Sequence, residues 1–248
     1  MVSWLRYILY QQWQELGSNI AYRNGVQGWF GNAFISKSWT SLPYQLAQDF
    51  QGDDIIYSLK DDNTSAQTVI ALANISKTLD FIRGAVGVTG TYKHTRITML
   101  SDGIPTLTRQ TTYRYGGRLN GNVTHWLFLS YEGMFSISKL GMNNVSQRAL
   151  HNALHQFSMT ITPTNELSVE GGMDYYHNQE LSGNKQNFCF LDAKLTWTLS
   201  KVVSIELAGT NLLNKKTYSY TTYGDMLSFS STRYLRGREV MMSVYLKR

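Results

Sequence analysis

Polar and apolar residues alternate along much of the chain, which is the pattern of β-strands with one apolar and one polar face. The clearest segment is Leu191–Ser200, in which odd positions are apolar and even positions are polar. The alternation recurs over 122–139, 149–161, 166–175 and 233–247, with turn-like sequences between these segments. The pattern therefore predicts an all-β protein, built either as a soluble sandwich or barrel or as a transmembrane antiparallel up-and-down β-barrel.

The lengths of the strands and of their connections favour the membrane alternative. The segment 122–139, taken as one strand, is far longer than an ordinary strand of about five or six residues, and a tilted transmembrane strand needs roughly 9–11. Transmembrane barrels typically alternate tight periplasmic turns with longer outer loops. Counting the predicted connections in this order places the C-terminus on the side of the short turns. Short turns are expected near 76–80, 120–121, 163–165 and 200–201, and longer polar loops near 101–105, 141–147, 178–186 and 214–231.

The first quarter of the chain is less regular than the rest. Strands are expected over 28–38 and 44–59. Before them, aromatic residues recur at a spacing of three, which is compatible with either a helix or a strand; these are Trp4, Tyr7, Tyr10 and Trp13. The expected organisation is N-terminal strands and loops of the barrel over 1–65 and C-terminal transmembrane strands over 66–248. About 9–12 strands are expected in all, as part of a larger barrel.

Composition supports long strands with aromatic girdles. Charged residues make up 16 % of the chain, against roughly 25 % in soluble domains, while 16 tyrosines and only three prolines occur. No run of about 18 apolar residues predicts a membrane-spanning helix. A net charge of +6 without a long Lys/Arg run gives little support to nucleic-acid binding, and none is expected.

The C-terminal part of the chain contains segments that resemble a known family. Residues 208–214 read Ala-Gly-Thr-Asn-Leu-Leu-Asn, and Tyr218 and the segment Arg-Tyr-Leu-Arg-Gly-Arg-Glu-Val at 233–240 follow. This region resembles the last two strands of TonB-dependent outer-membrane receptors, especially the Bacteroidetes-type outer-membrane β-barrel family. The resemblance implies a location in the cell outer membrane and uptake of a nutrient or metal chelate, without catalysis.

The chain departs from that family in its extent. It has room for about half of such a barrel, and it shows neither the plug domain nor the N-terminal segment that engages TonB. The resemblance therefore implies a receptor half from a truncated or split gene, which reaches TonB only through a missing N-terminal region. Because lipid does not tolerate unpaired strand edges, such a half closes as a smaller barrel, pairs with a partner, or fails to insert. The other expected partners are outer-membrane lipid and the barrel assembly machinery; the transported solute is unknown.

Three sets of residues are candidates for function. Charged residues of the polar phase are expected to face the lumen, either as a polar path for solute or as a hydrogen-bonded lining, because a basic residue at mid-membrane on the lipid face costs about 2–4 kcal/mol. These are Glu166, Glu170, Asp174, Asp192, Lys194 and Glu206. Tyr218, Tyr220 and Tyr223 lie in the last predicted loop, where they contact ligand from outside or belong to an aromatic girdle. The terminal strand offers Val240, Met242, Val244, Tyr245 and Leu246 to the assembly machinery.

Two alternatives stay open at this point: a soluble β-barrel that binds a small ligand, and an outer-membrane hydrolase. The hydrolase needs a nucleophile and a base together, but no G-x-S-x-G motif occurs, and Ser158 and His155 fall in opposite phases. His151 and His155 suit a shared metal only on a helix, because four residues of a strand span about 13 Å. No catalytic, cofactor-binding or metal-binding residues are expected, and no cofactor.

Overall fold

The computed structural model describes residues 12–42, 45–51, 54–60, 64–101, 103–143, 145–147, 149–179, 185–223 and 228–246. These residues form strands that are almost entirely antiparallel, together with one short 3-10 helix, η3 (Asp80–Ile82). The prediction of an all-β, antiparallel up-and-down architecture is confirmed.

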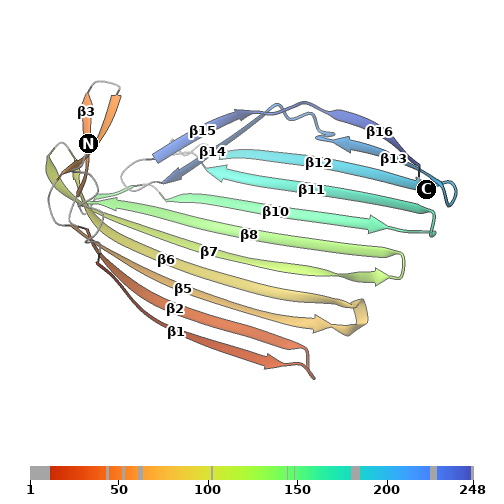
Figure 1. The fold of residues 1–248 in the computed structure, drawn as a ribbon, viewed down its shortest axis with the longest axis horizontal. Coiled ribbons are helices and arrows are strands. Elements are labelled where there is room, and N and C mark those ends of the chain that lie inside the picture. Colours follow the sequence, from red (N-terminus) through yellow and green to blue (C-terminus); the bar gives the residue numbers. More distant parts are fainter. Residues whose placement is uncertain are drawn as a thin grey trace.

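Eleven strands form one continuous curved sheet in which each strand pairs antiparallel with the next (Figure 1). Because β2 pairs with β5, the sheet runs without a break across residue 65. Among the described residues β1 and β16 form its two edges and do not pair with each other. In order, the strands are β1 (Gln12–Asn24), β2 (Trp29–Leu42), β5 (Thr64–Leu79), β6 (Gly84–Ser101), β7 (Ile104–Thr124), β8 (Leu127–Met142), β10 (Leu150–Ile161), β11 (Leu167–Gln179), β12 (Lys185–Thr198), β13 (Val203–Thr210) and β16 (Glu239–Leu246).

The remaining strands lie in the connections at one end of the sheet, on the left in Figure 1. Two of them, β3 (Gln45–Gln51) and β4 (Asp54–Lys60), form a hairpin between β2 and β5, where the sequence predicted a single strand. The two-residue β9 (Val145–Ser146) pairs antiparallel with the end of β8. A second hairpin, β14 (Thr217–Tyr223) and β15 (Ser228–Tyr234), connects β13 to β16.

The opposite end of the sheet carries the short connections. They comprise residues 25–28, 80–83, 125–126, 162–166 and 199–202, and β16 ends on the same side, as the parity of the sequence pattern predicted (Figure 1). At the other end, the connection between β6 and β7 is also tight, so the long loop predicted at 101–105 is wrong. Pro105 occupies the second position of β7, where a strand accommodates proline most readily near its start.

The turn predicted at 120–121 is also wrong, because these residues lie within the 21-residue strand β7. The true turn is at 125–126, so the predicted strand 122–139 is divided between β7 and β8. The two-residue turn pairs Thr124 with Leu127 and by itself reverses the odd–even phase, but a β-bulge between Asn122 and Thr124 adds one residue and restores it. Gly121 and Leu129 are therefore partners, and one odd-numbered apolar phase continues from β7 into β8. The alternation alone conceals a two-residue turn that is combined with a bulge.

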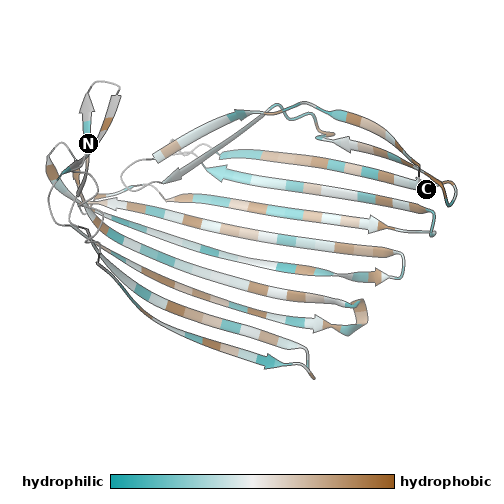
Figure 2. Cartoon of the chain, in the orientation of Figure 1, coloured by the Kyte–Doolittle hydropathy of each residue, from teal (hydrophilic) through white to brown (hydrophobic). Residues whose placement is uncertain are grey.

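Hydrophilic and hydrophobic bands alternate along the strands of the main sheet (Figure 2). Cross-strand pairing sorts these residues onto two faces. One row of direct partners runs Leu129, Met159, Gly171, Ala193, Gly209 and Val240, and defines what we call the apolar face. Another row runs Arg118, Glu132, Gln156 and Asp174, and defines the polar face. The apolar face is largely uncovered: Trp197 is 52 % exposed and Val244 54 %. Exposed apolar surface on this scale marks a face that contacts a partner or a membrane.

Close approach of β7 and β8 requires glycine at one point of the polar face. A Cβ added at Gly116 would contact the carbonyl oxygen of Gly133, whereas a Cβ added at Gly172, on the same face of β11, meets nothing within 4 Å. We expect Gly116→Ala to lower the free energy of unfolding by about 1–3 kcal/mol, as overpacking does, and Gly172→Ala to leave it nearly unchanged. Urea titration of both variants in detergent checks this; equal effects would contradict the close approach.

Candidate lumenal site beneath the hairpin

The predicted lumenal charges gather on the polar face of β11, β12 and β13. Glu170 lies opposite Lys194, and Lys194 Nζ is 3.0 Å from Glu170 Oε1. Asp174 Oδ1 accepts a hydrogen bond from Gln156 Nε2 at 3.1 Å, and Asp192 Oδ1 accepts one from the Asn211 amide at 2.7 Å. These contacts make the face a polar lining whose members are mutually satisfied.

The other two predicted residues lie nearer the short-connection end. Glu206 is opposite Thr196, and the Tyr245 hydroxyl donates to Glu206 Oε1 at 3.5 Å. Glu166, by contrast, lies in the connection 162–166 and not within β11. Its backbone carbonyl oxygen accepts a hydrogen bond from the Thr198 amide at 2.7 Å, and its own amide donates to Thr164 Oγ1 at 3.3 Å.

Charges are partitioned between the two faces along the whole main sheet. Every Asp and Glu in the described part of its eleven strands lies on the polar face; these residues are Glu15, Glu132, Glu170, Asp174, Asp192, Glu206 and Glu239. On the apolar face, lysine and arginine occur only at the margins. Lys77 Nζ lies 5.0 Å from the centre of the Trp29 ring on the short-connection side, and Lys37 Nζ lies 4.8 Å from that of Trp39 on the other.

The β14–β15 hairpin packs on the polar face. Sequence analysis placed its tyrosines in a loop, and this is corrected, because Tyr218, Tyr220 and Tyr223 all belong to β14. The Tyr218 ring is 5.3 Å from that of Tyr176 and 5.1 Å from that of Phe188. Two backbone carbonyls of β14 accept side-chain amides of the sheet: Asn178 Nδ2 donates to Ser219 O at 2.8 Å, and Gln110 Nε2 donates to Tyr223 O at 3.2 Å.

The three tyrosines therefore have different surroundings. Tyr223 is only 5 % exposed and forms a small buried cluster with Leu140 and Leu150. Tyr220 contacts the Tyr218 ring at 6.0 Å, and the Arg233 guanidinium lies 5.8 Å from its centre. A polar loop sequence rich in Thr, Ser and Tyr thus forms a hairpin because β-branched and aromatic residues suit a pleated surface that packs on another sheet.

A cleft of about 540 Å³ opens between the hairpin and the main sheet. Its lining includes the carboxylates of Asp174 and Asp192, the rings of Tyr176, Phe190 and Tyr218, and the Arg236–Glu239 pair. Its size falls within the range of small-molecule sites, in which apolar walls and a few polar groups fix the ligand. The arrangement suits a ligand with a flat apolar surface and hydrogen-bond donors, and it offers no nucleophile and base in contact.

Asn211, from the Asn-Leu-Leu-Asn segment, holds the two ends of the hairpin beside the sheet. Its Nδ2 donates to the carbonyls of Lys215 and Arg236 at 2.7 and 2.8 Å, and its Oδ1 accepts the Lys215 amide at 2.9 Å. Asn211 has a φ of 48° and Asn214 a φ of 55°, a left-handed conformation that asparagine tolerates better than most residues. The segment stands out in the sequence, but these contacts are visible only in the fold.

We expect Asn211→Ala to lower the free energy of unfolding by about 2–4 kcal/mol, because it removes three hydrogen bonds of about 1 kcal/mol each and strains a left-handed residue. Asn143→Ala is the matched control. Asn143 also has a positive φ, 45°, but among the described residues its side chain makes one hydrogen bond, which it accepts from the Leu107 amide at 2.8 Å. Denaturant melts of both variants measure the difference, and a control as damaging as Asn211→Ala would show that backbone strain alone is responsible.

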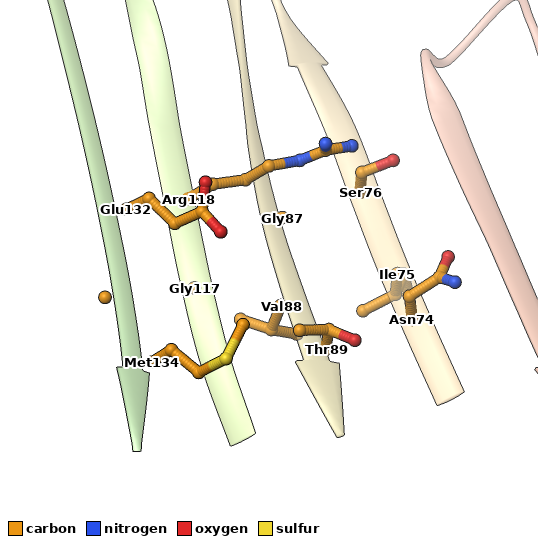
Figure 3. Close-up of a pocket in the computed structure, with 11 residues that line it drawn as sticks. Asn74, Ile75, Ser76, Gly87, Val88, Thr89, Gly117, Arg118, Glu132 and Met134 are labelled. Carbon is orange, nitrogen blue, oxygen red and sulfur yellow. The ribbon is translucent and has the colours of Figure 1, made fainter. Parts of the chain in front are cut away.

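A second, smaller cavity of about 280 Å³ lies where β5, β6, β7 and β8 adjoin (Figure 3). The Arg118 side chain crosses over Gly87 toward Ser76, and Glu132 extends from the neighbouring strand (Figure 3). A Cβ at Gly87 would lie 3.4 Å from Arg118 Nε and 3.2 Å from Ser76 Cβ. The glycine therefore gives the arginine its path across the polar face.

The two histidines that suggested a metal ligand pair occupy the apolar face instead. His155 Nδ1 is 2.7 Å from the Tyr131 hydroxyl, and its ring is 5.1 Å from that of Phe135 and 6.0 Å from that of Tyr175. The Tyr131 hydroxyl reaches it over Gly133, where a Cβ would lie only 2.6 Å away. In the described ranges, no group of three or more His, Cys, Asp or Glu is placed to hold a metal ion.

The last strand is an edge of the sheet. Val240, Met242, Val244 and Leu246 point to the apolar face and are all more than half exposed, whereas Tyr245 belongs to the opposite phase. Their role in assembly stays a prediction. Across the described part of the chain, no helix has the length and apolar character needed to cross a membrane.

Of the comparisons with known proteins, the one with solved structures finds a similarity. No protein-family model matches the chain, and no curated protein matches it. Among solved structures, the chain is similar to the ferric yersiniabactin uptake receptor FyuA from Yersinia pestis, with a TM-score of 0.48 and 11 % sequence identity. The alignment covers 96 % of this chain and 45 % of that receptor, so the chain spans less than half of the receptor's length.

Proposed function

We propose that this chain is a transmembrane segment of an outer-membrane β-barrel that takes part in uptake of a small solute. The observation that carries the proposal is the apolar face: it has no carboxylate in the described main-sheet strands, and its lysine and arginine side chains are confined to the two margins. In water, a face of this size would expose a continuous apolar surface. In a bilayer, the same face is solvated by lipid.

The spacing of the margins supports a membrane fit. On β2, Trp29 and Trp39 mark the two sides, with Gly31, Ala33, Ile35 and Lys37 between them on the apolar face, and Lys37 lies against the Trp39 ring. Ten residues of strand span about 33 Å. At a tilt of about 40° they rise about 25 Å, which is the height of the apolar band of outer-membrane barrels. Trp and Lys at both margins fit the interfacial positions where amphipathic side chains concentrate.

The uptake part of the proposal is supported by the polar face and by the C-terminal sequence. The cleft beneath the hairpin combines aromatic rings with carboxylates on the face that a barrel turns to its lumen. The Asn-Leu-Leu-Asn and Gly-Arg segments resemble TonB-dependent receptors of the Bacteroidetes type, and energy coupling would then act through a region outside this chain. The proposed partners are outer-membrane lipid, the barrel assembly machinery acting on β16, and a nutrient or metal chelate as cargo. We propose no catalytic role.

The edges of the sheet support a role as part of a larger barrel. In an up-and-down sheet of eleven strands the first and last strands run in the same direction, so β1 and β16 would pair in parallel if they met. Closure with antiparallel pairing throughout therefore requires an odd number of additional strands between them. Without closure or a partner, both edges would expose unpaired amides and carbonyls to lipid.

Expression behind a signal peptide, followed by outer-membrane fractionation and heat-modifiable gel migration, tests the proposal. We expect the chain in the outer-membrane fraction, with migration that changes on heating. A soluble, monomeric, β-rich product would contradict the membrane assignment. Aggregation relieved by co-expressed upstream barrel strands would support the larger barrel, and uptake of solute by that complex would then be measured with Tyr218 variants.

A further inference from the structure

The cleft between the β14–β15 hairpin and the main sheet has one wall made of aromatic rings. Tyr176 and Phe190 come from the neighbouring strands β11 and β12, and Tyr218 comes from the hairpin. The Tyr176 ring centre is 5.9 Å from that of Phe190 and 5.3 Å from that of Tyr218, and the last two are 6.4 Å apart. The ring planes meet at 77°, 71° and 56°, so the rings are not stacked on one another. Such a wall offers both ring faces and ring edges to a ligand.

Two aspartates lie beside this wall on the polar face of the sheet. Asp174 is the cross-strand partner of Phe190, and the side chains of direct partners lie about 4.5–5.5 Å apart. Asp192 is the partner of Gly172, where an added Cβ would meet nothing within 4 Å, so no side chain covers it from directly opposite. A carboxylate next to an aromatic surface is a combination that binds organic cations, because both groups attract positive charge.

Neither aspartate has its charge neutralised within the described part of the chain. Asp174 Oδ1 accepts a hydrogen bond from Gln156 Nε2 at 3.1 Å, and Asp192 Oδ1 accepts one from the Asn211 amide at 2.7 Å. Both donors are uncharged, so they orient the carboxylates and leave the negative charges in place. The ion pairs of the described residues involve glutamates only. A cationic ligand therefore meets two oriented carboxylates that no basic side chain has already paired.

The charged groups that line the cleft make it negative. Three carboxylates and one guanidinium give the described lining a net charge of −2; they belong to Asp174, Asp192, Glu239 and Arg236. The guanidinium of Arg236 is paired with Glu239 at 3.8 Å, and the Arg236 side chain is 88 % exposed, so its charge lies toward solvent. Four further basic residues of the hairpin and its ends lie outside the described lining; they are Lys215, Lys216, Arg233 and Arg238.

We propose that the cleft binds a planar organic cation. Its ring system lies against the wall formed by Tyr176, Phe190 and Tyr218, and its positive charge lies beside Asp174 and Asp192. The inference rests on the proposed function, because it treats the cleft as the solute site of an uptake barrel, and it names the class of solute. A cation in this position contacts both the hairpin and the main sheet. Binding therefore holds the hairpin on the sheet and slows amide exchange in β14 and β15.

The test measures binding of N-methylacridinium, a planar tricyclic cation, to the full chain folded in a zwitterionic detergent. Equilibrium dialysis with a protein-free detergent blank corrects for uptake by micelles. Two compounds of the same tricyclic shape complete the comparison: acridine, which is uncharged in mildly alkaline buffer, and the anion 9-anthracenecarboxylate. We expect the cation to bind at least about tenfold more tightly than either one. We also expect it to slow exchange of the hairpin amides.

Replacing both aspartates by asparagine tests the carboxylates and keeps acceptors for their hydrogen bonds. D174N/D192N should bind N-methylacridinium at least about tenfold more weakly, while its affinity for acridine stays within a few-fold of the original. The matched control is E132Q/E206Q, which removes the same charge from the polar face outside the described lining of the cleft. The control should bind the cation within a few-fold of the original chain.

The outcomes separate the cation site from the proposed function. In a chain that folds with heat-modifiable migration, equal affinity for the cation and for acridine would overturn the site. Equal loss in the two double variants, or hairpin exchange that does not change when the cation is bound, would overturn it as well. Failure of the chain to insert into the outer membrane would instead contradict the proposed function, and the uptake role of the cleft with it. Dialysis in detergent and membrane fractionation measure the two separately.

Discussion

Replacing Met159 by arginine is expected to prevent stable insertion of the barrel. Met159 lies on the apolar face between Leu129 and Gly171, about midway between the end of β10 and the aromatic cluster at His155. A basic residue on the lipid-facing band costs up to about 2–4 kcal/mol, the value at the bilayer midplane, which is a large share of the stability of a typical domain. Heat-modifiable migration after refolding into lipid vesicles measures the folded fraction, which should fall sharply.

The neighbouring position provides the matched control. Thr160 is on the polar face, opposite Phe128 and Glu170, so an arginine there gains a carboxylate partner and stays out of lipid. Thr160→Arg should therefore fold nearly as well as the original chain. If both variants fold equally, the apolar face does not contact lipid; if Thr160→Arg is the worse one, the two faces have been assigned the wrong way round.

The second large effect is expected at Tyr218. This ring contacts Tyr176, Phe188 and Phe190, which belong to the main sheet. Aromatic pairs contribute about 0.5–1.5 kcal/mol each, so Tyr218→Ala should weaken attachment of the hairpin by about 2–4 kcal/mol. Amide hydrogen exchange of β14 and β15 measures the attachment directly, because local opening exposes the amides.

Tyr220→Ala is the control for that experiment. The Tyr220 ring contacts Tyr218 and lies near Arg233, both within the hairpin itself, and no ring contact joins it to the described main sheet. Its replacement should leave exchange of the hairpin amides within about tenfold of the original, corresponding to a loss of at most about 1.4 kcal/mol. Equal acceleration in the two variants would show that the hairpin does not depend on the Tyr218 contacts for its place over the polar face.

Prediction from sequence succeeded where the alternation was unbroken and each face was nearly uniform. Leu191–Thr198 lies in β12 in the expected phase, and Glu170, Asp174, Asp192 and Lys194 share one face. It failed between β7 and β8, where a β-bulge beside the turn restored the phase, and in the β14–β15 hairpin, where a sequence of turn residues formed strands. The aromatic cluster around His155 was also missed. In the sequence its members appear only as Tyr, Phe and His residues of the apolar phase in three separate strands.

The sequence by itself determined the strand period, the division into two faces and the side on which the short connections lie, because these depend on neighbouring residues and parity. Only the tertiary structure decided which strands pair, that β1 and β16 remain edges running in the same direction, and that the β14–β15 hairpin covers the polar face. Those features rest on contacts between residues distant in sequence, such as Gln110 with Tyr223 and Asn178 with Ser219. Local alternation carries no information about such contacts, because many cross-strand partners satisfy the same pattern.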